Sequence, residues 1–254
     1  MFKYLRAKWR AGSATTWFFC VRHWLWPLLA PRFIILLGPP GIGKGTLAGR
    51  LATALGIRQM SPGDAFRREK AANTALAKVV SEAMASGGLV QDDITMEVVR
   101  RELTRPRYWR GGILDGVPRN LAQAKLLQSM LEDWGCSVAL VVSMEMDEAD
   151  EEKLIDRLEN RLTCSNKSCG RTYNLKSDPP RQAGCCDLCS SHLYRRADDV
   201  RAVIQQRLAT FRRETRPVTG FYKGNDSLLV VKPISMTKAE VLAAVLSRLS
   251  PAKK

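Results

Sequence analysis

A glycine-rich stretch with one lysine is the part of this sequence best suited to bind phosphate. It reads Gly38-Pro39-Pro40-Gly41-Ile42-Gly43-Lys44-Gly45-Thr46. The apolar run 33–37 before it predicts a buried strand, and the apolar residues after it recur at helical spacing. In a strand, loop and helix, backbone N–H groups and the helix N-terminus attract anions, while the lysine neutralises outer phosphates. An ordinary turn needs neither these glycines nor the lysine, so the stretch predicts a phosphate-binding loop.

Two further stretches combine acidic and basic side chains at predicted turns. The first, residues 112–119, places Asp115 at the end of a predicted strand, the edge at which parallel sheets bind ligands. Asp115 suits the hydration shell of a Mg²⁺ ion on nucleotide phosphates, and Arg119 suits a bidentate contact with a phosphate. The second, residues 61–67, begins with Ser61 and predicts a short turn and a helix start that exposes Arg67.

Five of the seven cysteines lie between residues 164 and 189, which favours a local site over a disulfide framework for the whole fold. Two close pairs of thiolates fit tetrahedral Zn²⁺, and the spacing gives the ligand set Cys164, Cys169, Cys186 and Cys189. Cys185 competes with Cys186 for the third position. A disulfide-linked loop and a site without metal are the alternatives. A metal would supply much of the folding energy of so small a segment, on the order of 10 kcal/mol.

The composition describes an ordinary globular chain with an anionic partner. The 254 residues suffice for one substantial domain with an insertion. A net charge of +15 favours nucleotide, nucleic acid or anionic lipid, without choosing among them. No run of about 20 uncharged apolar residues is present, so no clear membrane span is predicted.

Residues 1–32 differ in composition from the rest of the chain. They contain no Asp or Glu, include four of the six tryptophans, and carry the basic residues Lys3, Arg6, Lys8, Arg10, Arg22 and Arg32. Such a segment is typical of an organelle transit peptide. We expect a mitochondrial protein, in the matrix or at the inner-membrane surface, with a plastid as the alternative. A second interpretation is an arm that contacts a membrane surface, RNA or a protein assembly, and a third is a disordered tail. Sequence-specific nucleic-acid binding is not predicted.

From residue 33 onward apolar strands alternate with amphipathic helices, which predicts a parallel α/β sheet. The expected strands are 33–37, 57–60, 111–115, 138–144 and 228–232. The expected helices are 45–55, 92–104, 119–133, 147–160, 198–213 and 237–249. Arg157 and Arg161 lie four apart and would share one helix face, and a helix through both Arg196 and Arg207 would align them. Asp198 and Asp199 would orient Arg196 and Arg207 or cap the helix.

The motifs together resemble the adenylate kinase family, in its long form with a zinc-binding lid, over about residues 33–249. The loop is similar to the family's G-x-P-G-x-G-K-G-T, residues 61–67 to S-T-G-D-x-x-R, and residues 115–119 to D-G-F-P-R. The resemblance implies a P-loop nucleoside monophosphate kinase fold. Its core would be 33–60, 91–161 and 198–249, with a monophosphate-binding segment at 61–90, a Cys-rich lid at 162–197 and a basic tail at 250–254.

The resemblance also implies the reaction Mg·ATP + AMP ⇌ 2 ADP and roles for individual residues. The implied catalytic residues are Lys44, Asp115, Arg119, Arg161, Arg196 and Arg207. The implied ATP-binding residues are Gly38, Gly41, Ile42, Gly43, Lys44, Gly45, Thr46, Arg157 and Arg161. The implied AMP-binding residues are Ser61, Arg67, Gly88, Leu89, Val90, Gly116, Arg119, Gln123, Arg196 and Arg207, and Mg²⁺ and a structural Zn²⁺ would be the cofactors.

The sequence departs from the family pattern at three positions. Pro62 replaces a residue whose hydroxyl helps to read the base, and proline offers neither a hydroxyl nor a backbone N–H. Val117 replaces phenylalanine, and Asn174 replaces a histidine of the lid. A kinase with another base preference is therefore one alternative, and a nucleotide-binding scaffold subunit of an organellar assembly is the other.

Overall fold

The computed structural model of the chain describes residues 32–71, 89–166, 169–224 and 227–249. The predicted targeting segment up to residue 31, Gly88 and the basic tail at 250–254 lie outside the described residues. Within the described part, no helix is both long and apolar enough to cross a membrane.

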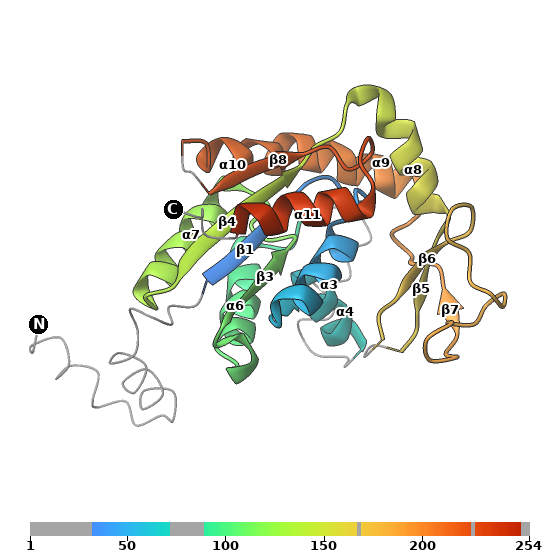
Figure 1. Cartoon of the computed structure of the whole chain (residues 1–254), viewed down its shortest axis with the longest axis horizontal. Helices are drawn as coiled ribbons and strands as arrows, with labels where there is room; N and C mark the ends of the chain where they lie inside the picture. The colour runs from blue at the N-terminus through green and yellow to red at the C-terminus, as the bar shows by residue number, and fades with distance from the viewer. Residues whose placement is uncertain (1–31, 72–88, 167–168, 225–226, 250–254) are drawn as a thin grey trace, which may run out of the picture.

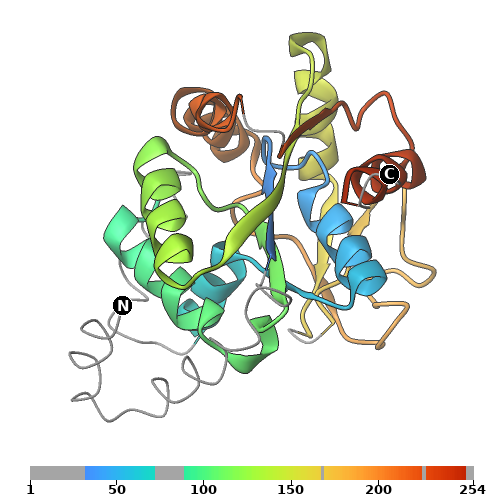
Figure 2. The same ribbon diagram turned by 60° about the vertical axis from the view of Figure 1, so that its left-hand side comes forward.

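A five-stranded parallel sheet forms the centre of the molecule (Figures 1 and 2). Its strands, in the order β2-β3-β1-β4-β8, are β2 (Arg58–Met60), β3 (Gly111–Asp115), β1 (Arg32–Leu37), β4 (Ser137–Met144) and β8 (Leu228–Val231). All five predicted strands are confirmed within one residue at each end. The apolar run of β1 is buried on both faces because it is the central strand, and its residues alternate between two core clusters.

Helices cover both faces of the sheet, as Figure 2 shows. One core cluster joins the sheet to α3 (Lys44–Leu55), α8 (Glu151–Glu159), α9 (Arg201–Thr210) and α11 (Lys238–Leu249). The other joins it to α6 (Asp92–Leu103), α7 (Leu121–Asp133) and α10 (Arg216–Phe221). The fold is therefore the predicted α/β architecture, and the six predicted helices are present with shifted ends. Short helices complete it: α4 (Pro62–Ala71), η1 (Pro106–Tyr108), η2 (Glu148–Asp150) and the π-helical turn η3 (Phe211–Thr215).

A separate three-stranded antiparallel sheet follows α8 and projects from the core (Figure 1). Its strands, in the order β6-β5-β7, are β6 (Thr172–Asn174), β5 (Arg161–Cys164) and β7 (Leu193–Tyr194). Its small core consists of Cys164, Tyr173, Cys186 and Leu193. We call residues 161–197 the lid sheet region. A core this small can bury little apolar area, so other interactions must hold the region together.

The prediction that Arg157 and Arg161 share a helix face was wrong, and the helix that would have aligned Arg196 with Arg207 does not form. Arg161 is the first residue of β5, because α8 ends at Glu159, so Arg157 and Arg161 do not share a helix face. Arg196 lies in the loop before α9, which begins at Arg201, so no helix runs through Arg196 and Arg207. In both cases the chain changes direction between the lid sheet region and the core, and periodicity cannot detect such a change.

Candidate active site

The glycine-rich loop takes backbone conformations that favour glycine and lies against α8 and β4. Gly38 and Gly41 have φ angles of +147° and +84°. A Cβ at Gly38 would lie 2.6 Å from the carbonyl oxygen of Met144, and one at Gly41 would lie 2.7 Å from Cγ of Leu158. Either substitution would therefore displace the loop. The glycines let the loop lead directly into α3, whose N-terminal N–H groups face the cavity described below.

Lys44 is the first residue of α3 and folds back over the loop. Its Nζ donates hydrogen bonds to the carbonyl oxygens of Gly38 (2.7 Å) and Pro39 (2.8 Å). Burial lowers the pKa of Lys44 to about 8, an effect that Asp115 opposes and Arg119 reinforces. The ammonium is thus held in a position where an additional negative charge would strongly stabilise it.

Asp115 ends β3 beside the loop, as predicted. Its Oδ2 accepts a hydrogen bond of 2.8 Å from Nε2 of Gln59, which is on β2. Burial raises the pKa of Asp115, and Lys44 counters that effect. The oxygen donor at the carboxyl edge of the sheet fits the chemistry of a hydrated Mg²⁺ ion.

Asp199 joins two of the predicted arginines. It accepts a bidentate pair of hydrogen bonds from Arg161, at 2.8 and 2.5 Å, and a longer contact of 3.4 Å from Arg207. Asp198 makes a 2.9 Å ion pair with Arg207. The side chain of Asp199 is fully buried, and α9 is capped at Val200 without a side-chain bond. The two aspartates therefore orient Arg207, as predicted, together with Arg161, whereas Arg196 bonds to Thr163; the capping alternative was wrong.

The basic side chains of the site lie close to one another and outnumber the acidic side chains that could pair with them. Burial, reinforced by the neighbouring Arg207, lowers the pKa of Arg119 to about 10. Burial and Arg161 likewise lower the pKa of Arg196 to about 10, and Nε of Arg196 donates to Oγ1 of Thr163 at 3.0 Å. Concentrated, partly desolvated positive charge of this kind stabilises a bound polyanion.

One open cavity of about 1950 Å³ between the core and the lid sheet region brings most of the predicted residues together. Its lining includes Gly38, Gly41, Gly43, Lys44, Gly45, Thr46, Ser61, Arg67, Leu89, Asp115, Gly116, Arg119, Arg157, Arg161, Arg196 and Arg207. Ile42 is the exception among the predicted ATP-binding residues, since its side chain is 1% exposed and packs in the core. Ile42 could therefore contact a nucleotide only through its backbone.

A smaller cavity of about 70 Å³ adjoins it, and we call it the acceptor cavity. Arg67, Arg119 and Arg207 line both cavities, which places cationic groups where the two meet. Arg67 is paired with Asp64 on α4. The acceptor cavity is lined by Pro62, Gly63, Phe66, Arg67, Leu89, Val90, Thr95, Gly116, Arg119, Gln123, Asp198 and Arg207.

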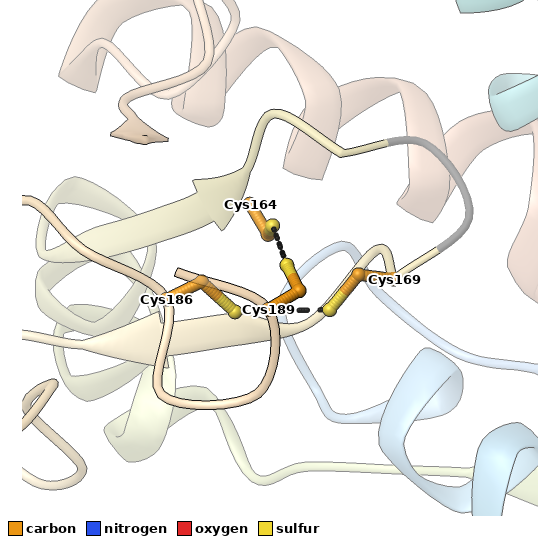
Figure 3. A group of neighbouring side chains, drawn as sticks. All are labelled: Cys164, Cys169, Cys186 and Cys189. Atoms are coloured by element: carbon orange, nitrogen blue, oxygen red, sulfur yellow. Dashed lines mark hydrogen bonds between the residues drawn. The ribbon is translucent and has the colours of Figure 1, made fainter. Parts of the chain in front are cut away.

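The four predicted metal ligands lie together in the lid sheet region (Figure 3). All four sulfur atoms are within 4.8 Å of one another, with Cys164 3.4 Å from Cys189 and Cys169 3.7 Å from Cys186. Ligands at about 2.3 Å in a tetrahedron would be about 3.8 Å apart, so these thiols fit Zn²⁺. Cys186, not Cys185, is the third member. The four cysteines are free thiols, which argues against the disulfide alternative.

The comparisons with known proteins agree with this geometry. Residues 36–227 match the sequence model of the adenylate kinase family. The chain is 40% identical to adenylate kinase of Thermosipho africanus over 198 residues, which is 78% of this chain and 90% of the relative. It is 41% identical to adenylate kinase of Anaeromyxobacter sp. over 79% of this chain and 92% of the relative.

The chain belongs to the adenylate kinase family. It is accordingly a nucleoside monophosphate kinase, a phosphotransferase. A third relative, adenylate kinase of Rhizobium rhizogenes, is 41% identical over 77% of this chain and 88% of the relative.

Several groups of this kinase site were missed by the sequence reasoning. Gln59 supports Asp115, and the hydroxyl of Tyr173 lies 3.4 Å from the sulfur of Cys186 while accepting from the N–H of Asp187 at 2.7 Å. The Tyr173 hydroxyl lowers the pKa of Cys186 to about 6. Asp92 contacts Gln123 from another helix. None of these contacts is local in sequence, so no motif could have signalled them.

Proposed function

We propose that the protein catalyses Mg·ATP + AMP ⇌ 2 ADP. The observation that carries the proposal is that Lys44, Asp115 and the predicted arginines line one cavity, at the carboxyl edge of a parallel sheet. The transfer of a phosphoryl group requires in-line positioning and neutralisation of charge rather than a covalent intermediate. The similarity to adenylate kinases supports ATP and AMP as the substrates.

The donor triphosphate binds along the loop in this proposal. The backbone N–H groups of residues 41–46 and the N-terminus of α3 cradle its phosphates, and Lys44 contacts the outer ones. Arg157 and Arg161 line the same cavity on the side of the lid sheet region, where they contact the base and phosphates of ATP. Asp115 would hold a hydrated Mg²⁺ ion, which supplies further charge neutralisation when bound.

The acceptor monophosphate binds where the two cavities meet. Arg67 and Arg119 hold its phosphate, while Arg196 and Arg207 stabilise the phosphoryl group in transit. Asp198 and Asp199 keep Arg161 and Arg207 in place before any substrate binds. No general base is required, because the acceptor phosphate is already ionised.

We further propose that residues 162–197 and 61–90 move as two inserts that close over the substrates and exclude water. Cys164, Cys169, Cys186 and Cys189 would hold a structural Zn²⁺ ion in the first of them. The ion would stabilise a region whose own core is small.

We also propose that residues 1–32 target the protein to mitochondria, with a plastid as the alternative, or contact a membrane, RNA or a protein assembly. The composition of this segment alone supports the proposal.

The proposed reaction is tested by measuring ADP formation with Mg·ATP and, separately, AMP, GMP, CMP and UMP. We expect turnover with AMP that Lys44→Ala reduces by at least about 10³-fold, since it removes a transition-state charge contact. Lys125→Ala, at an exposed site on α7, is the matched control and should keep full activity. Activity with another monophosphate alone would change the acceptor assignment. Absence of turnover with every acceptor would favour a nucleotide-binding scaffold.

A further inference from the structure

The acceptor cavity has few side chains that could recognise a base. Four of its lining residues, Pro62, Phe66, Leu89 and Val90, are apolar, and its charged residues suit the phosphate. The uncharged polar side chains are Thr95 and Gln123. The hydroxyl of Thr95 is buried and donates to the carbonyl oxygen of Val90 at 3.3 Å. Among the described lining residues, Gln123 is therefore the uncharged side chain that keeps both a donor and an acceptor for a base.

Two contacts fix the orientation of that amide. Its Oε1 accepts a 2.8 Å hydrogen bond from the backbone N–H of Arg119, and its Nε2 donates a 2.7 Å hydrogen bond to Oδ1 of Asp92. A backbone N–H can only donate and a carboxylate can only accept. The reversed amide would therefore face a donor with its N–H and a carboxylate with its oxygen. Both contacts select the same orientation.

Asp92 is itself held in place by the cap of the next helix. Nδ2 of Asn120 donates to both carboxylate oxygens of Asp92, at 2.9 and 3.0 Å. Oδ1 of Asn120 accepts from the backbone N–H of Gln123 at 2.8 Å and so caps α7. The Asn120 amide cannot reverse without losing both sets of contacts. Asp92, Asn120 and Gln123 thus form a closed network between α6 and α7.

We propose that Asp92 is a positioning residue that selects the acceptor base by fixing the amide of Gln123. This inference rests on the proposed function, since it concerns the monophosphate acceptor. After the two internal contacts, the amide has one N–H and one oxygen lone pair left for a ligand, in a fixed order. Because Arg67 and Arg119 hold the phosphate, the base approaches the N–H and the oxygen of the Gln123 amide in a single orientation. The fixed order suits an amino group beside an unprotonated ring nitrogen, as in adenine and cytosine, and opposes the oxo and N–H edge of guanine and uracil.

The proposal explains how Pro62 can be compatible with selectivity. Proline at this position removes a hydroxyl and an N–H, but the fixed amide still presents a donor and an acceptor. A site that hydrogen-bonds its substrate rejects an analogue whose groups are reversed, because buried polar groups are then left unpaired.

The test is Asp92→Asn in the full chain, with kcat and KM measured for AMP, GMP and ATP. An asparagine amide can either donate or accept, so Asp92→Asn removes one of the two contacts that select the orientation of Gln123 and leaves only the N–H of Arg119 to select it. We expect the kcat/KM ratio of AMP over GMP to fall at least tenfold, through a higher KM for AMP, while the KM for ATP is unchanged. Asp93→Asn removes the same charge from the same first turn of α6, at an exposed neighbour of the half-buried Asp92, and should keep the wild-type ratio. If Asp92→Asn does not fold, Asp92→Ala replaces it. That variant removes the acceptor without adding a donor, and we expect the same fall in the kcat/KM ratio.

The possible failures differ from one another. An unchanged AMP/GMP ratio in either folded Asp92 variant overturns the inference and leaves the kinase activity standing. A wild-type enzyme that uses AMP and GMP equally also overturns it. A wild-type enzyme that uses no monophosphate overturns the proposed function, and the inference with it.

Discussion

The buried carboxylate of Asp199 determines how the arginines of this site are arranged. Arg161 comes from the lid sheet region and Arg207 from α9, and both contact the side chain of Asp199, which is fully buried. An unpartnered guanidinium in the same place would be free to take many rotamers. Preorganised charge of this kind costs little reorganisation during a reaction, so in the proposed reaction the aspartate would act on catalysis without touching a substrate.

Asp199→Asn should therefore reduce kcat at least tenfold and lower the free energy of unfolding by about 3 kcal/mol, the cost of breaking a buried ion pair. The measurements are steady-state kinetics and urea denaturation. Asp147→Asn is the control, because Asp147 pairs with Lys232 on the surface and both are exposed; it should change stability by less than about 1 kcal/mol. A wild-type kcat for Asp199→Asn would show that the arginines position themselves.

The lowered pKa of Lys44 predicts how ATP binding depends on pH. The free ammonium titrates at about 8 instead of 10.5, and only its protonated form attracts phosphate. The bound triphosphate raises the pKa, so binding above pH 8 should take up a proton and the KM for ATP should increase with pH. Calorimetry in two buffers of different ionisation enthalpy measures the uptake. In Lys44→Arg the increase should move to higher pH, because guanidinium stays charged. Binding without proton uptake at pH 9 would contradict the predicted pKa.

At the scale of elements, the lid sheet region is the part least supported by its own apolar core. Its strands have two to four residues, and its buried cluster contains two cysteines, one tyrosine and one leucine. Backbone hydrogen bonds alone do not stabilise so short a sheet. The thiol cluster of Figure 3 joins the end of β5 to the loop between β5 and β6 and to the loop between β6 and β7. A metal there would take the place of an apolar core.

Cys186→Ser should therefore abolish stoichiometric zinc, measured by elemental analysis of the purified protein. It should also increase amide hydrogen exchange across β5, β6 and β7, because metal binding supplies folding energy. Cys185→Ser is the matched control one residue away, outside the cluster, and should retain the metal. Zinc retained by Cys186→Ser but lost by Cys185→Ser would show that the neighbouring cysteine is the ligand.

At the scale of the whole molecule, the main cavity is larger than a single bound nucleotide requires. Ligand pockets are typically about 300 to 1,000 Å³, whereas this one is about 1950 Å³ and lies open between the core and the lid sheet region. Phosphoryl transfer to an acceptor other than water requires exclusion of solvent. In the described residues this cavity is therefore open, and the proposed reaction would need it to close.

Mg·ATP together with AMP should close the molecule. Small-angle X-ray scattering is expected to show a smaller radius of gyration with both substrates than with either alone, because each binds between the core and one insert. Lys44→Ala, which weakens the phosphate contacts, should reduce the change at the same concentrations. A radius that both substrates leave unaltered would mean that transfer occurs without closure.

Much of this protein was determined by the sequence alone. The five strands, the six helical regions and the loop around Lys44 follow from local patterns, because a strand–loop–helix unit has a short-range signature. The cysteine spacing predicted the cluster for the same reason, since each pair is a local turn.

The tertiary structure decided what depends on contacts between distant residues. It assigned Arg161 to a strand and Arg196 to a loop, so that Arg161 does not share a helix face with Arg157 and no helix aligns Arg196 with Arg207. It showed that Asp199 orients arginines instead of capping α9, and that Asp92 and Arg119 fix the amide of Gln123. These contacts join residues on different elements. A hydrogen bond between elements depends on how they pack, and packing is a property of the folded chain that no single segment contains.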